Sequence, residues 1–177
     1  MGTIRTLISA EEIENKLAEI GARITRDYEG KDLLVVGVLK GAFIVMADLA
    51  RHIDLPVDFD FMAVSSYGAS TQTSGVVRIL KDLDQEIADR HVLIVEDIID
   101  SGLTLNYLLK SLSVRKPASI EIASLLVKTG IQRVPIEVRY TAFEIGPEFV
   151  IGYGLDYAGR YRNLPYVGVM EGDPDAD

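Results

Sequence analysis

The sequence predicts an α/β protein with a mainly parallel, twisted sheet flanked by helices. Three observations support this fold class. Aliphatic runs of strand length, such as LLVVGVL and HVLIVEDII, alternate with segments of helical periodicity in the middle of the chain. Strands this hydrophobic are typical of parallel sheets buried on both faces. A series of short strands late in the chain breaks the alternation and predicts a small additional lobe built from the chain ends.

The first helix is expected to begin after Ser9, because Ser9 and Glu12 form a capping-box pattern. Its apolar positions recur at helical spacing, and they are Ile13, Leu17, Ile20 and Ile24. Gly30 is its expected end. Residues 33–39 then predict a strand, and residues 43–53 predict a helix.

Residues 57–64 alternate in polarity and predict another strand. The stretch SSYGASTQTSG, residues 65–75, is small and polar and predicts a loop. Loops of this length in a compact domain are often functional lids. Residues 76–83 and 91–99 are expected to form strands, with the second at the centre of the sheet.

Residues 103–116 predict a helix that Pro117 ends. The remaining strands are expected at residues 119–127, 138–145, 149–155 and 166–170.

Length and composition predict one domain, residues 1–177, with an acidic tail at residues 171–177 that is expected to be disordered. The chain contains no cysteine, which excludes disulfides and fits a reducing cytoplasm. Its net charge of −9 and the lack of a dense Lys/Arg run argue against a nucleic-acid partner. An apolar run of membrane-spanning length is also missing, so we expect a soluble cytoplasmic protein.

Three carboxylates lie at the end of the most hydrophobic strand, namely Glu96, Asp97 and Asp100. Ligands of open α/β sheets bind beyond the carboxyl ends of the strands. The next turn opens a helix, so its backbone N–H groups and the hydroxyls of Ser101 and Thr104 can cradle a phosphate. A hydroxylated sugar phosphate with a hard metal ion fits both the carboxylates and the turn that can bind phosphate. A single aspartate here is often only a helix cap, but the whole pattern is far more specific.

The stretch LIVEDIIDSGLTL closely resembles the phosphoribosyl-diphosphate signature of the type I phosphoribosyltransferases. VGVLKGAFIVMADL resembles the pyrophosphate loop of the hypoxanthine-guanine enzymes of that family, and SSYG resembles the start of their mobile lid. SLLVK and PEFVIGYGLDYAGRYRNLPYVGVM resemble their purine-site segments. The resemblance covers the chain from about the first helix to Met170. It implies the type I phosphoribosyltransferase fold with a hood lobe from the chain ends.

The resemblance also implies a reaction. The enzyme would transfer 5-phosphoribosyl from phosphoribosyl diphosphate to hypoxanthine or guanine, giving IMP or GMP plus pyrophosphate. Mg²⁺ would be the cofactor, and the chain would form a homodimer or homotetramer.

In this family Glu96 and Asp97 would hold the ribose hydroxyls, directly or through metal-bound water. Asp100 would accept the proton from the imidazole-side nitrogen of the purine. A carboxylate close to other carboxylates and partly desolvated suits a general base. The residues implied to bind the 5′-phosphate are Ser101, Gly102, Leu103 and Thr104.

Lys128 resembles the lysine that donates to the 6-oxo group. An ammonium is donor-only, so it would reject adenine, which offers a donor amine there. Phe149 would stack on the purine, and Val150 would read its Watson–Crick edge with the backbone. The alternatives are an ordinary solvated lysine and two core residues of a strand.

Asp156 resembles a magnesium ligand that touches pyrophosphate, and Arg162 resembles the arginine that grips it, because a planar donor fork suits phosphate oxygens. The implied pyrophosphate loop consists of Leu39, Lys40 and Gly41. In the family the peptide bond before this lysine is often cis, which a sequence does not reveal.

Ser66 and Tyr67 match lid residues that close over the diphosphate. The sequence departs from many bacterial relatives after Lys128, where Thr129 and Gly130 replace a proline and basic residues. Three alternative functions remain open. They are a xanthine-preferring enzyme, an RNA-binding regulator of the same fold, and a flavodoxin-like module with Asp97 as a phosphoacceptor.

Overall fold

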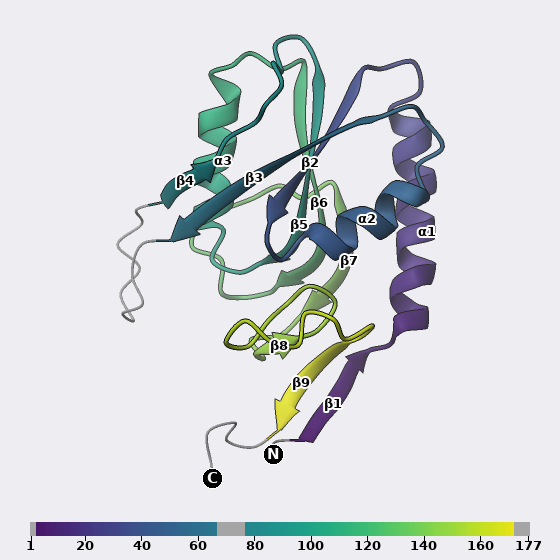
Figure 1. Cartoon of the computed structure of the whole chain (residues 1–177), viewed down its shortest axis with the longest axis vertical. Coiled ribbons are helices and arrows are strands. Elements are labelled where there is room, and N and C mark those ends of the chain that lie inside the picture. The colour runs from purple at the N-terminus through teal and green to yellow at the C-terminus, as the bar shows by residue number, and fades with distance from the viewer. Residues whose placement is uncertain (1–2, 67–76, 172–177) are drawn as a thin grey trace.

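The computed structural model describes residues 3–66 and 77–171 (Figure 1). The expected acidic tail, apart from Glu171, and the lid residue Tyr67 lie outside the described residues. In chain order the elements are β1 (Thr3–Ile8), α1 (Ala10–Asp27), β2 (Leu33–Leu39), α2 (Phe43–Arg51), β3 (Asp58–Ser66), β4 (Val77–Lys81), β5 (His91–Ile99), α3 (Leu103–Ser113), β6 (Ser119–Lys128), β7 (Tyr140–Ile145), β8 (Val150–Ile151) and β9 (Val167–Glu171).

The main sheet has six strands in the order β4-β3-β2-β5-β6-β7. All neighbouring pairs are parallel except β3 and β4. The prediction of a mainly parallel sheet with residues 91–99 at its centre is therefore confirmed. Because the parallel strands share one direction, the segments that follow β2, β5 and β6 meet at the same edge of the sheet.

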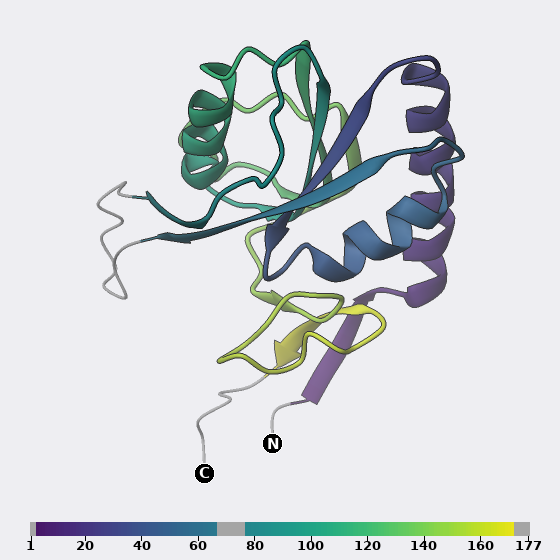
Figure 2. The same cartoon turned by 45° about the horizontal axis from the view of Figure 1, so that its top comes forward.

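Helices cover both faces of this sheet (Figures 1 and 2). α1 and α2 pack on one face through Ile13, Leu17 and Leu49, and α3 packs on the other through Leu105 and Leu108. The predicted capping box at the start of α1 is confirmed. The Ser9 Oγ accepts a hydrogen bond from the Glu12 N–H at 3.1 Å, and the Ser9 N–H donates to Glu12 Oε2 at 2.8 Å.

A second, three-stranded sheet in the order β1-β9-β8 forms the predicted small lobe from the chain ends. It lies beyond the carboxyl ends of the central strands (Figure 2). β1 was not predicted, because it is short, mostly exposed and paired with β9, far away in the sequence. The strand predicted at residues 149–155 is wrong beyond Ile151. Gly152, Tyr153 and Gly154 have φ values of 91°, 49° and 99°, which no strand accommodates.

Within the described part of the chain, no helix is both long and apolar enough to cross a membrane.

Candidate active site

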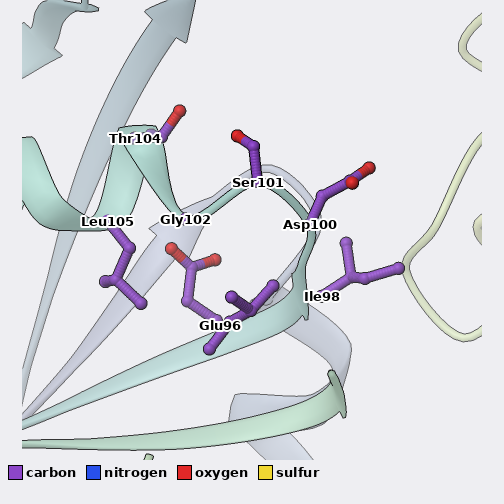
Figure 3. Close-up of a pocket in the computed structure, with 8 residues that line it drawn as sticks. Glu96, Ile98, Asp100, Ser101, Gly102, Thr104 and Leu105 are labelled. Carbon is purple, nitrogen blue, oxygen red and sulfur yellow. The ribbon is translucent and has the colours of Figure 1, made fainter. Parts of the chain in front are cut away.

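The loop after β5 forms a small pocket at the start of α3 (Figure 3). Gly102 caps the helix with a φ of 82°, a conformation that glycine adopts without steric cost. The Leu103 N–H donates to Ser101 Oγ at 3.4 Å. The pocket measures about 100 Å³ and is lined by Glu96, Ile98, Ile99, Asp100, Ser101, Gly102, Thr104 and Leu105. Its size and the helix N-terminus suit a phosphate group.

Residues 133–136 contact the loop between β5 and α3. The Arg133 N–H donates to the Ser101 carbonyl at 2.9 Å. A Cβ atom added at Gly102 would lie 3.0 Å from Ile136 Cγ1, so the side chain packs directly against the glycine. Residues 133–136 follow the Thr129–Gly130 departure, and sequence reasoning did not assign them a role. The structure shows that they contact the loop between β5 and α3.

Glu96 and Asp97 are adjacent at the end of β5 but occupy different surroundings. Glu96 is only 7% exposed, and its carboxylate points toward the loop between β5 and α3 (Figure 3). Burial, followed by the charge of Asp97, raises the pKa of Glu96 well above its ordinary value. Burial likewise raises the pKa of Asp97, to about 6, although its hydrogen bond from the Ile98 N–H lowers it.

This raised pKa predicts a pH-dependent stability of the free protein. Folding raises the pKa of Asp97 from 3.8 to about 6, so the native state binds more protons in this range. The stability that protonated Asp97 contributes at low pH is therefore lost as the pH rises from about 4 through about 6. At pH 8 the Asp97→Asn variant should be more stable than the parent by up to about 3 kcal/mol, and the gain should shrink toward pH 4. Urea unfolding across this range measures it. A gain that stays constant with pH would contradict the explanation.

Asp100 lies beside Lys128, as expected for groups at the ends of neighbouring strands. The Lys128 Nζ is 3.6 Å from Asp100 Oδ2. The Lys128 side chain is 10% exposed, which argues against an ordinary solvated lysine. The Asp100 side chain is 60% exposed and is therefore only partly shielded from solvent. Glu96 is buried and Asp97 is partly buried, so both of these carboxylates are more shielded from solvent than Asp100.

The residues after β2 form a tight loop against Asp97. The peptide bond between Leu39 and Lys40 is cis. A Cβ atom added at Gly41 would lie 2.5 Å from Asp97 Cγ and closer still to Oδ2, so a larger residue would force the loop or the carboxylate to move. The structure thereby brings the predicted pyrophosphate loop into contact with a predicted ribose-binding acid.

Asp156 and Arg162 contact each other in the turn after β8. Arg162 Nη2 lies 3.0 Å from Asp156 Oδ1, and Nη1 donates to the Gly154 carbonyl at 2.6 Å. Asp156 Oδ2 accepts from the Gly159 N–H at 2.7 Å. The charges of both residues also act on the pKa of Asp97, which Arg162 lowers and Asp156 raises.

A cluster of three or more His, Cys, Asp or Glu side chains able to hold a metal is not found among the described residues. The carboxylates of Glu96, Asp97 and Asp156 therefore do not by themselves form a complete coordination shell for a metal ion. They fit Mg²⁺ in another way, since this ion is usually held by one or two carboxylates together with phosphate oxygens of the substrate. The raised pKa values of Glu96 and Asp97 reflect carboxylates whose charged forms lack compensation, and a nearby cation would supply it.

Phe149 and Val150 behave differently from one another. Val150 is buried, whereas Phe149 is 56% exposed and therefore not a core residue. Sequence reasoning missed Tyr157, whose ring meets the Phe149 ring edge-to-face with centroids 6.0 Å apart. Its place in the GYGLDY segment was the available signal. Ser66 is the last residue of β3.

Comparisons with known proteins agree with this geometry. The phosphoribosyl transferase domain family matches residues 7–158. The chain is 53% identical over 167 residues to the hypoxanthine-guanine phosphoribosyltransferase of Bacillus subtilis, covering 94% of this chain and 93% of the relative. It is 52% identical over 171 residues to the Mycobacterium avium protein of the same name, covering 93% and 84%.

The fold is also similar to a solved structure. The crystal structure of a hypoxanthine phosphoribosyltransferase from Staphylococcus aureus superimposes with a TM-score of 0.91 and 46% sequence identity. The match covers 94% of this chain and 91% of that one.

Proposed function

The chain belongs to the phosphoribosyltransferase family, and on that premise we propose that it is the purine-salvage enzyme that makes IMP or GMP. It transfers 5-phosphoribosyl from phosphoribosyl diphosphate to hypoxanthine or guanine and releases pyrophosphate. The observation that carries this choice of base is the Lys128–Asp100 pair, 3.6 Å apart beside the phosphate pocket. A donor-only group next to an acceptor matches the adjacent 6-oxo group and ring nitrogen of a 6-oxopurine.

Each part of the donor substrate meets a different segment in this proposal. The 5′-phosphate binds the N-terminus of α3 at residues 101–104. The ribose hydroxyls lie near Glu96 and Asp97. The pyrophosphate contacts the loop of residues 39–41 and Arg162. These segments all lie at strand ends along one edge of the sheet or belong to the lobe beyond that edge, which supports their joint role.

The reaction breaks the bond between the anomeric carbon and pyrophosphate while the purine nitrogen attacks that carbon. Asp100 accepts the proton that the purine loses. Lys40 and Arg162 bind the departing pyrophosphate and offset its charge. When bound, Mg²⁺ would neutralise further negative charge, and Asp156 with Asp97 and the substrate phosphates would hold it. Positioning and electrostatics supply most of the acceleration.

The proposal is tested by pyrophosphate release from phosphoribosyl diphosphate with each base offered separately. Hypoxanthine and guanine should support turnover, and adenine should support very little. A chelator of divalent cations should abolish the reaction. If xanthine wins a direct competition among the bases, the choice of substrate is wrong. If no purine supports release, the enzyme assignment itself fails.

Lys128 should determine the discrimination against adenine. In the Lys128→Gln variant the buried donor becomes an amide that can also accept, so the 6-amino group no longer leaves a charge unpaired. We expect kcat/KM for hypoxanthine to fall about 100-fold, with a much smaller change for adenine. Lys110→Gln, on the exposed surface of α3, is the matched control and should change neither value. An unchanged preference in Lys128→Gln would remove the lysine from the specificity mechanism.

We also propose that the enzyme is cytoplasmic and forms a homodimer or homotetramer. The absence of cysteine fits a reducing compartment. Two aromatic side chains on one face, Phe43 and Phe59, are 45% and 43% exposed and line an apolar hollow, which suits a subunit contact. For a relative from Trypanosoma cruzi, a solved structure addresses how the C-terminal region affects oligomeric state. Light scattering of the purified chain measures the assembly.

A further inference from the structure

The turn that follows β8 has an unusual residue at its centre. Tyr153 has a φ of 49° and lies between Gly152 and Gly154, which have φ values of 91° and 99°. Glycine adopts the left-handed region without cost, whereas a side chain there must be held by its surroundings. The local backbone therefore favours glycine at all three positions. The tyrosine at position 153 therefore indicates that its side chain makes a contact that the turn requires.

The side chain of Tyr153 connects this turn to α2. Tyr153 is 7% exposed, and its hydroxyl donates a hydrogen bond to Asp48 Oδ2. Burial, followed by this bond, raises the pKa of Tyr153 above its ordinary value, so the hydroxyl remains a donor. The other carboxylate oxygen of Asp48 pairs with Arg51 at 2.8 Å, and Arg51 is 74% exposed. Tyr153 thus anchors the turn to α2 through Asp48, and α2 starts at Phe43, two residues after Gly41.

The same turn touches the parts of the site assigned to pyrophosphate. A Cβ atom added at Gly154 would collide with the Gly41 carbonyl oxygen, so the turn rests directly on the loop of residues 39–41. The Gly154 carbonyl accepts from Arg162 Nη1 at 2.6 Å, and its N–H donates to the Arg162 carbonyl at 2.9 Å. A shift of the turn would therefore move both groups that bind the leaving pyrophosphate.

We propose that the hydrogen bond between Tyr153 and Asp48 positions the pyrophosphate site by clamping the turn of residues 152–154 onto Gly41 and Arg162. The inference rests on the proposed function and adds two positioning residues to it. Neither side chain touches the reacting atoms. Their effect should appear in the binding of phosphoribosyl diphosphate and pyrophosphate, rather than in the binding of the purine.

The central test compares Tyr153→Phe with the parent enzyme. The variant keeps the ring and loses only the hydroxyl. We expect KM for phosphoribosyl diphosphate and the dissociation constant for magnesium pyrophosphate to rise about tenfold. The KM for hypoxanthine should stay within about twofold, as should kcat. Steady-state kinetics give the constants for both substrates, and calorimetry gives pyrophosphate binding without turnover.

The chain contains a matched control for this change. Tyr140 is also buried, and its hydroxyl donates to Asp27 Oδ2 at 2.6 Å. It is the first residue of β7, so it lies at the end of the strand that faces away from the candidate site. Tyr140→Phe removes the same type of bond away from the site. It should lower thermal stability about as much as Tyr153→Phe does, with unchanged kinetics.

Two substitutions of Asp48 separate the hydrogen bond from other effects. Asp48→Asn keeps an acceptor oxygen for the Tyr153 hydroxyl and should retain most of the parent's affinity for magnesium pyrophosphate. Asp48→Ala removes the acceptor and should weaken this affinity as Tyr153→Phe does. Arg51→Gln removes the exposed ion pair of Asp48 but leaves Tyr153 bound, and it should behave as the parent.

The outcomes distinguish this inference from the proposed function. If the parent enzyme is active and Tyr153→Phe binds pyrophosphate as tightly as the parent does, the clamp has no positioning role and the inference alone fails. Equal loss for both substrates, or equal effects of Tyr140→Phe, would mean a general structural role and would also overturn it. If the parent neither turns over nor binds magnesium pyrophosphate, both proposals fail together.

Discussion

Replacing Asp100 with asparagine should lower kcat for hypoxanthine by about 10²–10⁴-fold, the usual contribution of a general base. The amide oxygen still faces Lys128, whose Nζ lies 3.6 Å from the Asp100 carboxylate. It cannot take up the proton of the purine. Stability should change little, because the Asp100 side chain is 60% exposed. Steady-state kinetics with saturating phosphoribosyl diphosphate measure the loss, and thermal unfolding confirms that the variant is folded.

A second substitution separates proton transfer from support of Lys128. Asp100→Ala removes the base and also leaves a largely buried ammonium without this partner. If Asp100 acts as a base, both variants are nearly inactive. If it only holds Lys128 in place, the asparagine variant recovers most of the activity. Asp84→Ala breaks another aspartate–lysine pair, with Lys81 at 3.3 Å, and should leave kcat unchanged.

The central part of the fold was readable from the sequence because local signals agree with tertiary structure there. The Ser9–Glu12 capping box sets the start of α1, and the continuous aliphatic runs mark the buried strands β2 and β5. In the hood lobe, β9 was predicted at residues 166–170, whereas the strand predicted at residues 149–155 is limited to Val150–Ile151. β1 carries no comparable signal, since its stability depends on pairing with β9 at the other end of the chain.

The candidate site was predicted as a set of residues, but its electrostatics were not. The motif identifies three acids at the end of β5, and only the packing decides which are buried. Glu96 is 7% exposed, while the Asp100 side chain is 60% exposed. Close approaches between distant segments are equally invisible in a sequence. Glycine at positions 41 and 154 signals a constraint, but the contact of Gly41 with Asp97 and of Gly154 with Gly41 appears only in the structure.

The first of these contacts makes Gly41→Ala a severe substitution. The new Cβ atom would lie 2.5 Å from Asp97 Cγ and closer to Oδ2, well inside the distance that real atoms maintain. Asp97 cannot simply swing aside, because its Oδ1 accepts from the Ile98 N–H at 2.7 Å. Either the loop of residues 39–41 or the carboxylate must move. Since a displacement of about 1 Å at an active site can cost about 10²-fold, we expect kcat/KM for phosphoribosyl diphosphate to fall at least that much.

Gly146→Ala is the matched control for this effect. Its Cβ atom would also approach a carboxylate, at 2.6 Å from Glu148 Oε2, but Glu148 is exposed and free to rotate away. This variant should keep the activity and stability of the parent. The two alanines thus introduce the same atom beside the same chemical group, and they differ in whether the neighbour can yield. Similar activity in both would show that the loop of residues 39–41 is not the rigid pyrophosphate site proposed here. A loss confined to Gly41→Ala would place the cost in the contact between this loop and Asp97.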